Sequence, residues 1–419
     1  MLLQVTPTSS TQQTQLLPLT MQQRFDYPIP VGVHAIPEEQ LDLRPDAEID
    51  EDLVNPKPIS RDSEKNIWFF WHSGFKGMHP YTQRNIRAWH RRFSKSGWTI
   101  RVVNRVADSP LNIANFIDVS DPGMFPQAFV DGTIGGDFAP QHTSDLVRWP
   151  LLLKHGGVYA DVGLLQIGDL DKLWKTTVGD PESPYEILSY NGGGVEERHL
   201  TNYFLCARKN NPLFERAHRL LLKLWEGRVD TEGMSASPLL KDVPMMGLHL
   251  GEMVSRELTD YIIQGQCVRL VMRLVDEDGG WDGPRYCAEK VYAIEYMQGS
   301  QLINEFTDWN GPEAFRLMSL TLPKDGEEVS EDQRKAREIV EACLSKSFGF
   351  KLAHGIIIKV LGETLGSLWR KHTGSDDVPG TYGHWLRYGM IHWCPDTLPE
   401  RLEFEVIPPA KRGPLLEEN

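Results

Sequence analysis

With 419 residues, the chain is long enough to bury a large hydrophobic core, as one elaborated domain or as two to three ordinary ones. Its formal net charge of −14 at pH 7 argues against a nucleic-acid partner and against an anionic membrane surface, because both attract a clustered excess of Lys and Arg. The composition therefore indicates a globular protein that does not bind nucleic acid.

The five cysteines stand far apart in the sequence, and no two of them form a C-x-x-C pair. This number and spacing match neither a disulfide framework nor a zinc site, so we expect reduced thiols in the core. The N-terminal stretch lacks a basic flank followed by an apolar run, and nowhere do 18 apolar residues follow one another. We therefore expect a cytoplasmic protein without an integral membrane segment.

Residues 1–62 are rich in Gln, Thr, Pro and acidic side chains and show no sustained hydrophobic period. A segment of this composition cannot bury enough apolar surface to form a core of its own. The sequence therefore predicts a tail that is followed by an irregular segment wrapped around the folded domain.

A strand, a helix and a second strand are expected between residues 66 and 104. The run NIWFFWHSG is typical of a buried strand that opens into a loop. In YTQRNIRAWHRRF, the residues Ile86, Trp89 and Phe93 recur at helical spacing, and the arginines fall mostly on the other face. WTIRVVN follows as the second strand. This order predicts an α/β domain with parallel strands, a class that often binds nucleotides.

The segment SDLVRWPLLLKH predicts a further helix, with Ser144 as its N-cap and Gly156 and Gly157 at its end. Pro150 is expected to kink or shorten this helix. The strand predicted after it, within GGVYADVGLL, carries one carboxylate, Asp161, among apolar residues. An isolated acidic side chain in such a strand calls for a functional explanation.

Later helices are marked by their first residues. Asn211, followed by proline, predicts one N-cap, and Ser330 with Gln333 forms the pattern of a capping box. Residues 281–312 are predicted as short strands and turns, and the chain after Pro395 is polar and Pro-rich.

Asp145, Arg148 and Asp161 belong to one pattern. It consists of S-D-x-x-R on the helix from Ser144 and, after a gap of seven residues, G-G-x-Y-x-D at the strand. Asp145 and Arg148 lie one helical turn apart and therefore face the same way. Taken singly, these residues have plainer interpretations, an ion pair on a helix surface and an Asp161 that caps a turn. The spacing of the whole set favours a functional site.

These stretches resemble the GT-A glycosyltransferases of the DXD sugar-binding or capsular-polysaccharide-synthesis type, which are akin to family 32 and to the large clostridial glucosylating toxins. IWFFWHSG resembles their first nucleotide-binding strand, SDLVRWPLLLKHGGVYAD their donor-sugar helix and metal-carboxylate strand, and LTNYFLCARKNNPLF their Asn-containing strand. WNGPEAF, FKLAHG and GTYGHWLRYGMIHW resemble later segments. The resemblance implies an α/β fold of the GT-A type, Rossmann-like, with a mostly parallel central sheet and helical additions.

The resemblance also implies three parts of the chain: a tail and irregular wrap in residues 1–62, a GT-A catalytic domain in residues 63–320, and a C-terminal helical extension with a closing segment in residues 321–419.

One departure concerns the metal motif. The family's pattern is Asp-x-Asp, whereas this chain has Asp161-Val162-Gly163, so the second carboxylate is missing. Mg²⁺ normally keeps several waters and uses few protein ligands, so one carboxylate, two phosphate oxygens and waters can hold it. We therefore expect Mn²⁺ or Mg²⁺ at Asp161, bound weakly when no nucleotide is present.

The resemblance implies a role for each remaining candidate. Asp161 binds the metal, and His384 supplies a C-terminal ligand, with His392 in reserve; each histidine also has a plain interpretation as a core residue. Asp145 and Arg148 grip hydroxyl groups of the donor sugar or its ribose.

Further donor contacts are implied at Trp71, which stacks on the uracil of a UDP-sugar, at Tyr159, and at Asn202, which contacts the sugar. The plainer interpretations are a core tryptophan at Trp71 and a turn amide at Asn202. The expected catalytic set is thus Asp145, Arg148, Asp161 and Asn202.

No general base stands out, and the carboxylates Glu196, Glu197 and Asp308 have no assigned role. This fits a retaining transferase, in which the resemblance implies that the departing phosphate oxygen takes the acceptor proton. The function predicted is transfer of a hexose, from UDP-glucose or UDP-galactose, to a hydroxyl of a soluble small molecule. The alternatives are a non-catalytic protein that binds sugar nucleotides and a sugar-phosphate transferase of capsule-type glycan synthesis.

Overall fold

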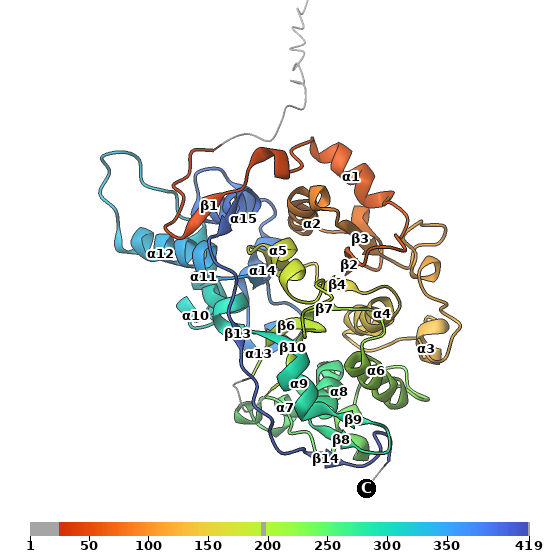
Figure 1. The fold of residues 1–419 in the computed structure, drawn as a ribbon. Helices are drawn as coiled ribbons and strands as arrows, with labels where there is room; N and C mark the ends of the chain where they lie inside the picture. The colour runs from red at the N-terminus through yellow and green to blue at the C-terminus, as the bar shows by residue number, and fades with distance from the viewer. Residues whose placement is uncertain (1–24, 194–197, 418–419) are drawn as a thin grey trace, which may run out of the picture.

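A computed structural model of the protein describes residues 25–193 and 198–417, and a seven-stranded sheet forms its centre (Figure 1). Within the described residues five of these strands run in one direction, while β7 and β13 run in the other. The predicted α/β class with a mostly parallel sheet is confirmed. In spatial order the strands are β13 (Arg401–Leu402), β10 (Val291–Glu295), β6 (Ile187–Asn191), β7 (Leu200–Ala207), β4 (Gly157–Ala160), β2 (Asn66–Phe70) and β3 (Thr99–Val103).

Helices cover both faces of this sheet. Successive side chains of a strand point to opposite faces, so Trp68 of β2 enters one hydrophobic cluster and Phe69 enters the other. This is why the strand at residues 66–70 is apolar throughout. The first cluster is closed by α4 (Ala139–His155), α6 (Pro212–Leu224), α8 (Ile263–Met272) and α9 (Gly283–Lys290), and the second by α1 (Asp46–Val54), α2 (Pro80–Phe93) and α5 (Leu170–Thr176).

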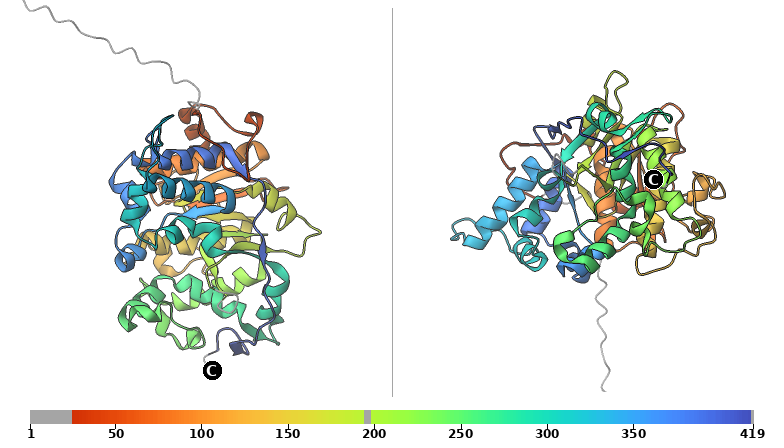
Figure 2. Two further views of the ribbon diagram at one scale, coloured as in Figure 1. Left: turned by 90° about the vertical axis from the view of Figure 1, so that its left-hand side faces the viewer. Right: turned by 90° about the horizontal axis from the view of Figure 1, so that it is seen from below.

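A second group of helices gathers at one side of the sheet around a third hydrophobic cluster, as the blue ribbons of Figure 2 show. Two small antiparallel sheets tie it to the rest: β1 (Val33–Ala35) pairs with β12 (Trp393–Pro395), and β5 (Leu164–Gln166) pairs with β11 (Gly349–Lys351). The helices are α10 (Leu302–Phe306), α11 (Gly311–Met318), α12 (Glu331–Lys346), α14 (Leu365–Lys371) and α15 (Tyr382–His392).

The remaining elements lie at the periphery. Among the described residues no helix is long and apolar enough to cross a membrane. All five cysteines are buried and unpaired, as predicted. The division at residues 62 and 320 stays a prediction. The peripheral elements are α3 (Gln127–Val130), α7 (Glu252–Tyr261), α13 (Ile356–Leu361), β8 (Leu274–Asp276), β9 (Trp281–Asp282), β14 (Lys411–Arg412) and a π-helix (Met297–Gln301).

Several predicted helix starts are confirmed. The Asn211 side chain accepts hydrogen bonds from the backbone N–H groups of Leu213 and Phe214, in the first turn of α6, at 3.1 Å each. Ser330 and Gln333 form the reciprocal capping box of α12. Local side-chain chemistry therefore sets these two boundaries.

Other boundaries were predicted wrongly. Helix α4 begins at Ala139, so Ser144 lies inside it and is not its N-cap, and the helix continues past Pro150 to His155. Asp161 does not lie within a strand: β4 ends at Ala160, and a turn follows in which Leu164 N donates to Asp161 O at 2.9 Å. Asp161 therefore stands at the end of a strand.

Helices also form where none was predicted. Residues 46–54 form α1, whose Ile49 and Leu53 are fully buried against α2, and residues 281–312 contain α9 and α10. Short helices with few apolar residues are stabilised mainly by tertiary packing, which a local pattern does not reveal. In the polar end of the chain, β13 pairs with β10 of the central sheet.

Two of the arginines on the polar side of α2 are buried. Arg91 and Arg92 are each less than a tenth exposed. Arg91 donates to the Asp46 carboxylate at 2.7 Å, and Arg92 donates to backbone carbonyls that include Ile167 O at 2.6 Å. The segment before β2 covers Arg91, and residues 166–168 cover Arg92, so the two arginines bind backbone and carboxylate oxygens in place of water.

Candidate active site

The predicted donor-site residues meet at the edge of the sheet where the parallel strands end. Trp71 follows β2 and Asp161 follows the neighbouring strand β4. Strand β7 runs the other way, so Asn202, near its beginning, reaches the same edge. The Asp161 N–H donates to Tyr203 O at 2.9 Å, which joins the two strands there. Ligands of open α/β sheets bind at this edge.

Arg148 links the two carboxylates. Its Nη2 lies 2.7 Å from Asp145 Oδ1 and 3.6 Å from Asp161 Oδ1. The guanidinium lies over the Tyr159 ring, with Cζ 4.8 Å from the ring centroid, and it also donates to the backbone carbonyl of Asn202. Because Arg148 is only 2% exposed, its charge is held in place by these partners. The face of α4 that carries Asp145 and Arg148 therefore points to the end of β4.

Asp145 is held from two further sides. Asn202 Nδ2 lies 3.3 Å from Asp145 Oδ1, and Gln264 Nε2 donates to the Asp145 backbone oxygen at 2.8 Å. Ser144 Oγ and Tyr159 Oη are hydrogen-bonded at 2.7 Å. Asp145, Arg148, Tyr159, Asn202 and Asp161 thus form one connected group.

Lys351 completes the group from a distant part of the chain. It is the last residue of β11, which pairs with β5 so that Lys351 lies opposite Leu164. Its Nζ lies 3.0 Å from Asp161 Oδ2. Burial raises the pKa of the Asp161 carboxyl, but the charges of Lys351 and Arg148 outweigh burial, so the pKa lies below its ordinary value. Asp161 is therefore ionised at neutral pH, and 26% of its side chain is exposed.

Gly163 faces the same ammonium group. Its backbone does not have a positive φ, so a left-handed conformation does not explain the glycine. A Cβ atom built on it would lie 3.2 Å from Leu352 O and 3.6 Å from Lys351 Nζ. In place of a second carboxylate, this position therefore has a glycine that faces a cation.

His354 is the histidine within electrostatic reach of Asp161. Its Nε2 and Tyr81 Oη are hydrogen-bonded at 2.7 Å. Burial, together with the charges of Lys351 and Arg370, lowers the pKa of His354 to about 3, although the Asp161 charge acts in the opposite direction. The imidazole is therefore neutral at physiological pH, the form that can bind a metal ion.

The sequence patterns do not single out Lys351 and His354, although both belong to FKLAHG, a segment that resembles the family. The signal was available as one cationic and one imidazole side chain within that short segment. It could not be used, because the pairing of β11 with β5 is a contact over almost 200 residues that no local pattern reveals.

The structure does not bring His384 to Asp161. His384 Nδ1 and Tyr27 Oη are hydrogen-bonded at 2.7 Å, and the ring packs against Phe25 with centroids 4.6 Å apart. His392 stacks on Tyr388 in the same helix. Both histidines thus pack among aromatic side chains.

The other candidates are placed as follows. Trp71 is partly buried, and its Nε1 donates to Gly77 O at 3.3 Å. Asp308 is exposed in the turn after α10. Glu196 and Glu197 lie outside the described residues.

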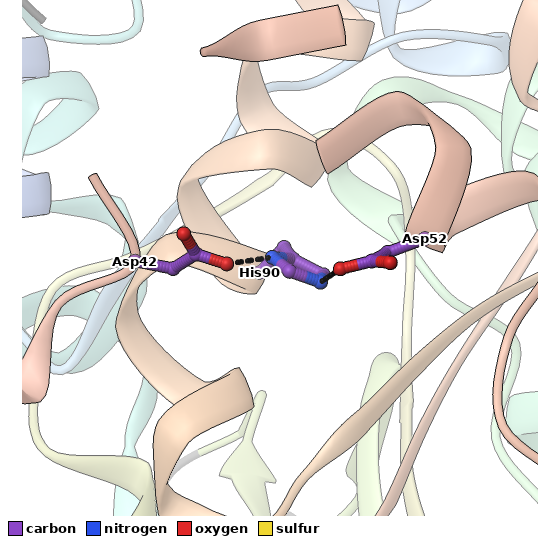
Figure 3. A group of neighbouring side chains, drawn as sticks. All are labelled: Asp42, Asp52 and His90. Atoms are coloured by element: carbon purple, nitrogen blue, oxygen red, sulfur yellow. Dashed lines mark ion pairs between the residues drawn. The ribbon is translucent and has the colours of Figure 1, made fainter. Parts of the chain in front are cut away.

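A second cluster of possible metal ligands lies far from Asp161, at the end of α2 (Figure 3). Its members are Asp42, Asp52 and His90, whose ligand atoms all lie within 4.8 Å of one another. The His90 ring stands between the carboxylates, with Nδ1 3.5 Å from Asp42 Oδ2 and Nε2 3.6 Å from Asp52 Oδ2. The two nitrogens face opposite ways, so one ion cannot use both of them.

Arg44 already bridges the same two carboxylate oxygens. Its Nη2 lies 2.6 Å from Asp42 Oδ2 and 2.5 Å from Asp52 Oδ2. A groove of about 1130 Å³ is lined by this cluster and by Trp98. Since one nitrogen of the Arg44 guanidinium already contacts both carboxylates, we interpret the cluster as an ion-pair network.

Comparison with known proteins identifies relatives of this chain. The family described as "Capsular polysaccharide synthesis protein" matches residues 33–231. The chain is 33% identical to O-glycosyltransferase braB of Annulohypoxylon truncatum, over 87% of this chain and 88% of that protein. It is 33% identical to glycosyltransferase afumC of Aspergillus fumigatus, over 84% and 91%, and 30% identical to O-glycosyltransferase PaGT of Phomopsis amygdali, over 87% and 90%.

Among solved structures, a chain named PaToxG glycosyltransferase overlaps 54% of this chain and 86% of its own length, with 17% identity and a TM-score of 0.27. The catalytic domain of alpha-toxin from Clostridium novyi overlaps 53% and 71%, with 11% identity and a TM-score of 0.25.

The relatives that match over most of their length define the class of this protein: it is a glycosyltransferase, an enzyme that acts on a sugar donor and an acceptor. Within that class, the chain belongs to the same family as the transferases of Annulohypoxylon truncatum, Aspergillus fumigatus and Phomopsis amygdali.

Proposed function

We propose that this enzyme is a metal-dependent, retaining hexosyltransferase of the GT-A type that uses UDP-glucose or UDP-galactose. The observation that carries the proposal is Asp161, a single ionised carboxylate at the carboxyl edge of the sheet, with Lys351 Nζ at 3.0 Å and Arg148 Nη2 at 3.6 Å. A carboxylate between two cations suits a ligand that brings negative charge together with a divalent ion.

The donor atoms around Asp161 fit an ion that is shared with a diphosphate. One carboxylate with accessible oxygens faces the site, and hard cations such as Mg²⁺ take oxygen ligands from carboxylates, phosphates and water. Asp161 would hold the ion, and the neutral His354, which interacts electrostatically with Asp161, would be the imidazole available to it. The ion would supply positive charge against the diphosphate as it departs.

The connected side chains would hold the sugar donor. Asp145 is fixed by Arg148 and Asn202, so its remaining oxygen lone pairs are oriented to accept from sugar hydroxyls. Trp71, at the end of β2, would stack on the uracil, and Tyr159 supports Arg148 from below its guanidinium plane. The shared position of these residues at one edge of the sheet supports the proposed roles.

The reaction breaks the bond between the anomeric carbon of the sugar and the diphosphate oxygen. The acceptor oxygen forms the new bond to that carbon on the same face, and the acceptor proton passes to the departing phosphate oxygen. The products are a glycoside and UDP, so atoms and charge balance. Arg148 and Lys351 are placed to stabilise the negative charge that develops on the diphosphate.

The acceptor atom is proposed from the relatives. Two of them are named O-glycosyltransferases, which supports an oxygen acceptor in this chain. A soluble small molecule as acceptor and a cytoplasmic location stay predictions from the sequence.

The test is incubation of the purified protein with UDP-glucose or UDP-galactose, Mn²⁺ and a mixture of small hydroxyl-bearing acceptors. UDP release and the anomeric configuration of the glycoside, read by NMR coupling, are measured. We expect UDP release that EDTA abolishes and a product with the anomeric configuration of the donor.

Each other outcome selects an alternative. Nucleotide binding without UDP release would indicate a non-catalytic sugar-nucleotide-binding protein. Release of UMP with transfer of phosphate would indicate a sugar-phosphate transferase. An inverted anomer would remove the retaining mechanism while leaving the hexosyl transfer in place.

A further inference from the structure

We infer that Lys351 binds the diphosphate of the donor and, when no nucleotide is bound, serves as the counterion of Asp161 that keeps divalent metal out. This inference rests on the proposed function, because it assigns a residue to the diphosphate of that donor. It makes Lys351 a two-position cation, paired with Asp161 before binding and with phosphate after it.

The contact geometry supports the first position. Lys351 Nζ lies 3.0 Å from Asp161 Oδ2, so it occupies the side of the carboxylate opposite to Arg148, which approaches Oδ1. The same ammonium lies 5.7 Å from the centroid of the Tyr203 ring. A metal ion that binds Asp161 in the free enzyme must therefore displace or face a positive charge at close range.

The backbone supports the second position. Lys351 is held by the pairing of β11 with β5, so its main chain is fixed while four side-chain carbons remain free to turn. A Cβ on Gly163 would lie 3.6 Å from Nζ, so only hydrogen atoms of the glycine separate this backbone from the ammonium. The absence of a side chain at position 163 leaves room for Nζ to leave Asp161.

The charges of the group explain why the exchange is coupled to the nucleotide. Asp145 pairs with Arg148, and Asp161 pairs with Lys351, so the four charges balance without a ligand. A divalent ion alone would leave the group positive. A diphosphate and a divalent ion arriving together keep the balance, because the phosphate oxygens give Lys351 a new partner.

The Asp161–Lys351 ion pair is also open to a purely structural interpretation. Its side chains are 26% and 17% exposed, and partly exposed ion pairs contribute little to stability. The two interpretations predict different effects of removing Lys351 on the affinities for metal and nucleotide. If Lys351 is only structural, its removal lowers stability and leaves ligand affinities unchanged. If it is a two-position cation, its removal strengthens metal binding and weakens nucleotide binding.

The experiment is calorimetric titration of Lys351→Met with Mn²⁺ alone, with UDP in EDTA, and with UDP in the presence of Mn²⁺. Compared with wild type, we expect Mn²⁺ alone to bind at least about threefold more tightly. UDP without metal should bind at least about tenfold more weakly, the loss typical of one charged hydrogen bond. Lys351→Arg, which keeps the charge, should retain weak Mn²⁺ binding and most of the UDP affinity.

The matched control is Lys175→Met. Lys175 forms an ion pair of 2.6 Å with Asp171, away from the site, and all three affinities should remain those of wild type. If Lys351→Met does not fold, wild type decides by comparing metal-free UDP with uridine. UDP should bind at least about tenfold more tightly, because uridine carries no group for Lys351.

Two results overturn the inference separately from the proposed function. If wild type releases UDP from UDP-glucose while Lys351→Met keeps wild-type affinities for Mn²⁺ and UDP, the pair is structural and only the inference falls. Equal binding of UDP and uridine by wild type has the same meaning. If wild type binds no UDP and transfers no sugar, the proposed function falls and the inference falls with it.

Discussion

The Asp161 site and the Asp42 cluster differ in how their carboxylates are paired with cations. Asp161 stands alone at the carboxyl edge of the sheet, with single contacts from Lys351 and Arg148 and a quarter of its side chain exposed. Asp42 and Asp52 are two carboxylates with a histidine between them, but Arg44 clamps Asp42 through two nitrogens and reaches Asp52 as well.

The difference shows that the number of carboxylates does not identify a metal site. A rigid guanidinium that satisfies both oxygens of a carboxylate leaves no coordination position, whereas a flexible ammonium can be replaced. The Asp161 group also stands where parallel strands end and a ligand can approach, while the Asp42 group lies where an N-terminal segment covers a helix. Four predictions test this contrast.

The largest effect is expected for Asp161→Asn. Loss of the carboxylate removes the metal contact at a developing charge, so sugar transfer should fall at least about a hundredfold, or ~2.7 kcal/mol. Steady-state UDP release measures it, and thermal unfolding checks that the fold persists. Retention of more than about a tenth of wild-type activity, ~1.4 kcal/mol, would remove Asp161 from the metal site.

A smaller effect, a gain in affinity for Mn²⁺, is expected for Gly163→Asp. The new carboxylate would meet Lys351, whose Nζ lies 3.6 Å from the built Cβ, and would release Asp161 for metal. Mn²⁺ should then bind about tenfold more tightly without nucleotide, ~1.4 kcal/mol by calorimetry.

Gly163→Ala is the control for this variant, since its Cβ meets Leu352 O at the same 3.2 Å and should lower stability by about 1 kcal/mol without changing metal affinity. Unchanged Mn²⁺ affinity in a folded Gly163→Asp protein would show that a carboxylate at position 163 neither draws Lys351 away from Asp161 nor contacts the ion.

The third prediction concerns pH and His354. Its pKa is about 3 in the folded protein against an ordinary 6.5, so the unfolded chain binds the extra proton between these values. Stability should therefore fall as pH decreases below 6.5, by about 1 kcal/mol at pH 5.5 from this group. His354→Gln should remove this contribution to the pH dependence of the free energy of unfolding, which is measured by urea titrations at several pH values.

His90 provides the comparison for the pH experiment. Burial lowers its pKa too, but the Asp42 and Asp52 charges oppose burial, whereas Lys351 acts with burial at His354. His90→Gln should flatten the pH dependence less than His354→Gln does. The reverse order would mean that the Lys351 charge does not act on His354.

The smallest effect is expected for Asp52→Asn. Asp52 and Arg44 are 48% and 43% exposed, and exposed ion pairs contribute little, so the free energy of unfolding should change by no more than about 0.5 kcal/mol. Activity and its stimulation by Mn²⁺ should stay at wild-type values. A loss of metal stimulation in this variant would move the metal site to the Asp42 cluster.

The sequence by itself determined the parts of this protein that depend on neighbours in the chain. The strand at residues 66–70, the helix from residue 80 and the strand at residues 99–103 follow from hydrophobic period, and Asn211 and Ser330 cap helices as their chemistry requires. Asp145 and Arg148 could be paired from spacing alone, because one helical turn fixes their directions.

Only the tertiary structure decided which distant side chains join them. Lys351 and His354 reach Asp161 through a strand pairing across the chain, His384 packs with Tyr27 instead, and Arg91 is buried under a segment that looked irregular. Hydrogen bonds within a turn or a helix are specified by adjacent residues. Ion pairs between segments far apart arise only when hydrophobic cores bring those segments together, and that packing is a property of the whole chain.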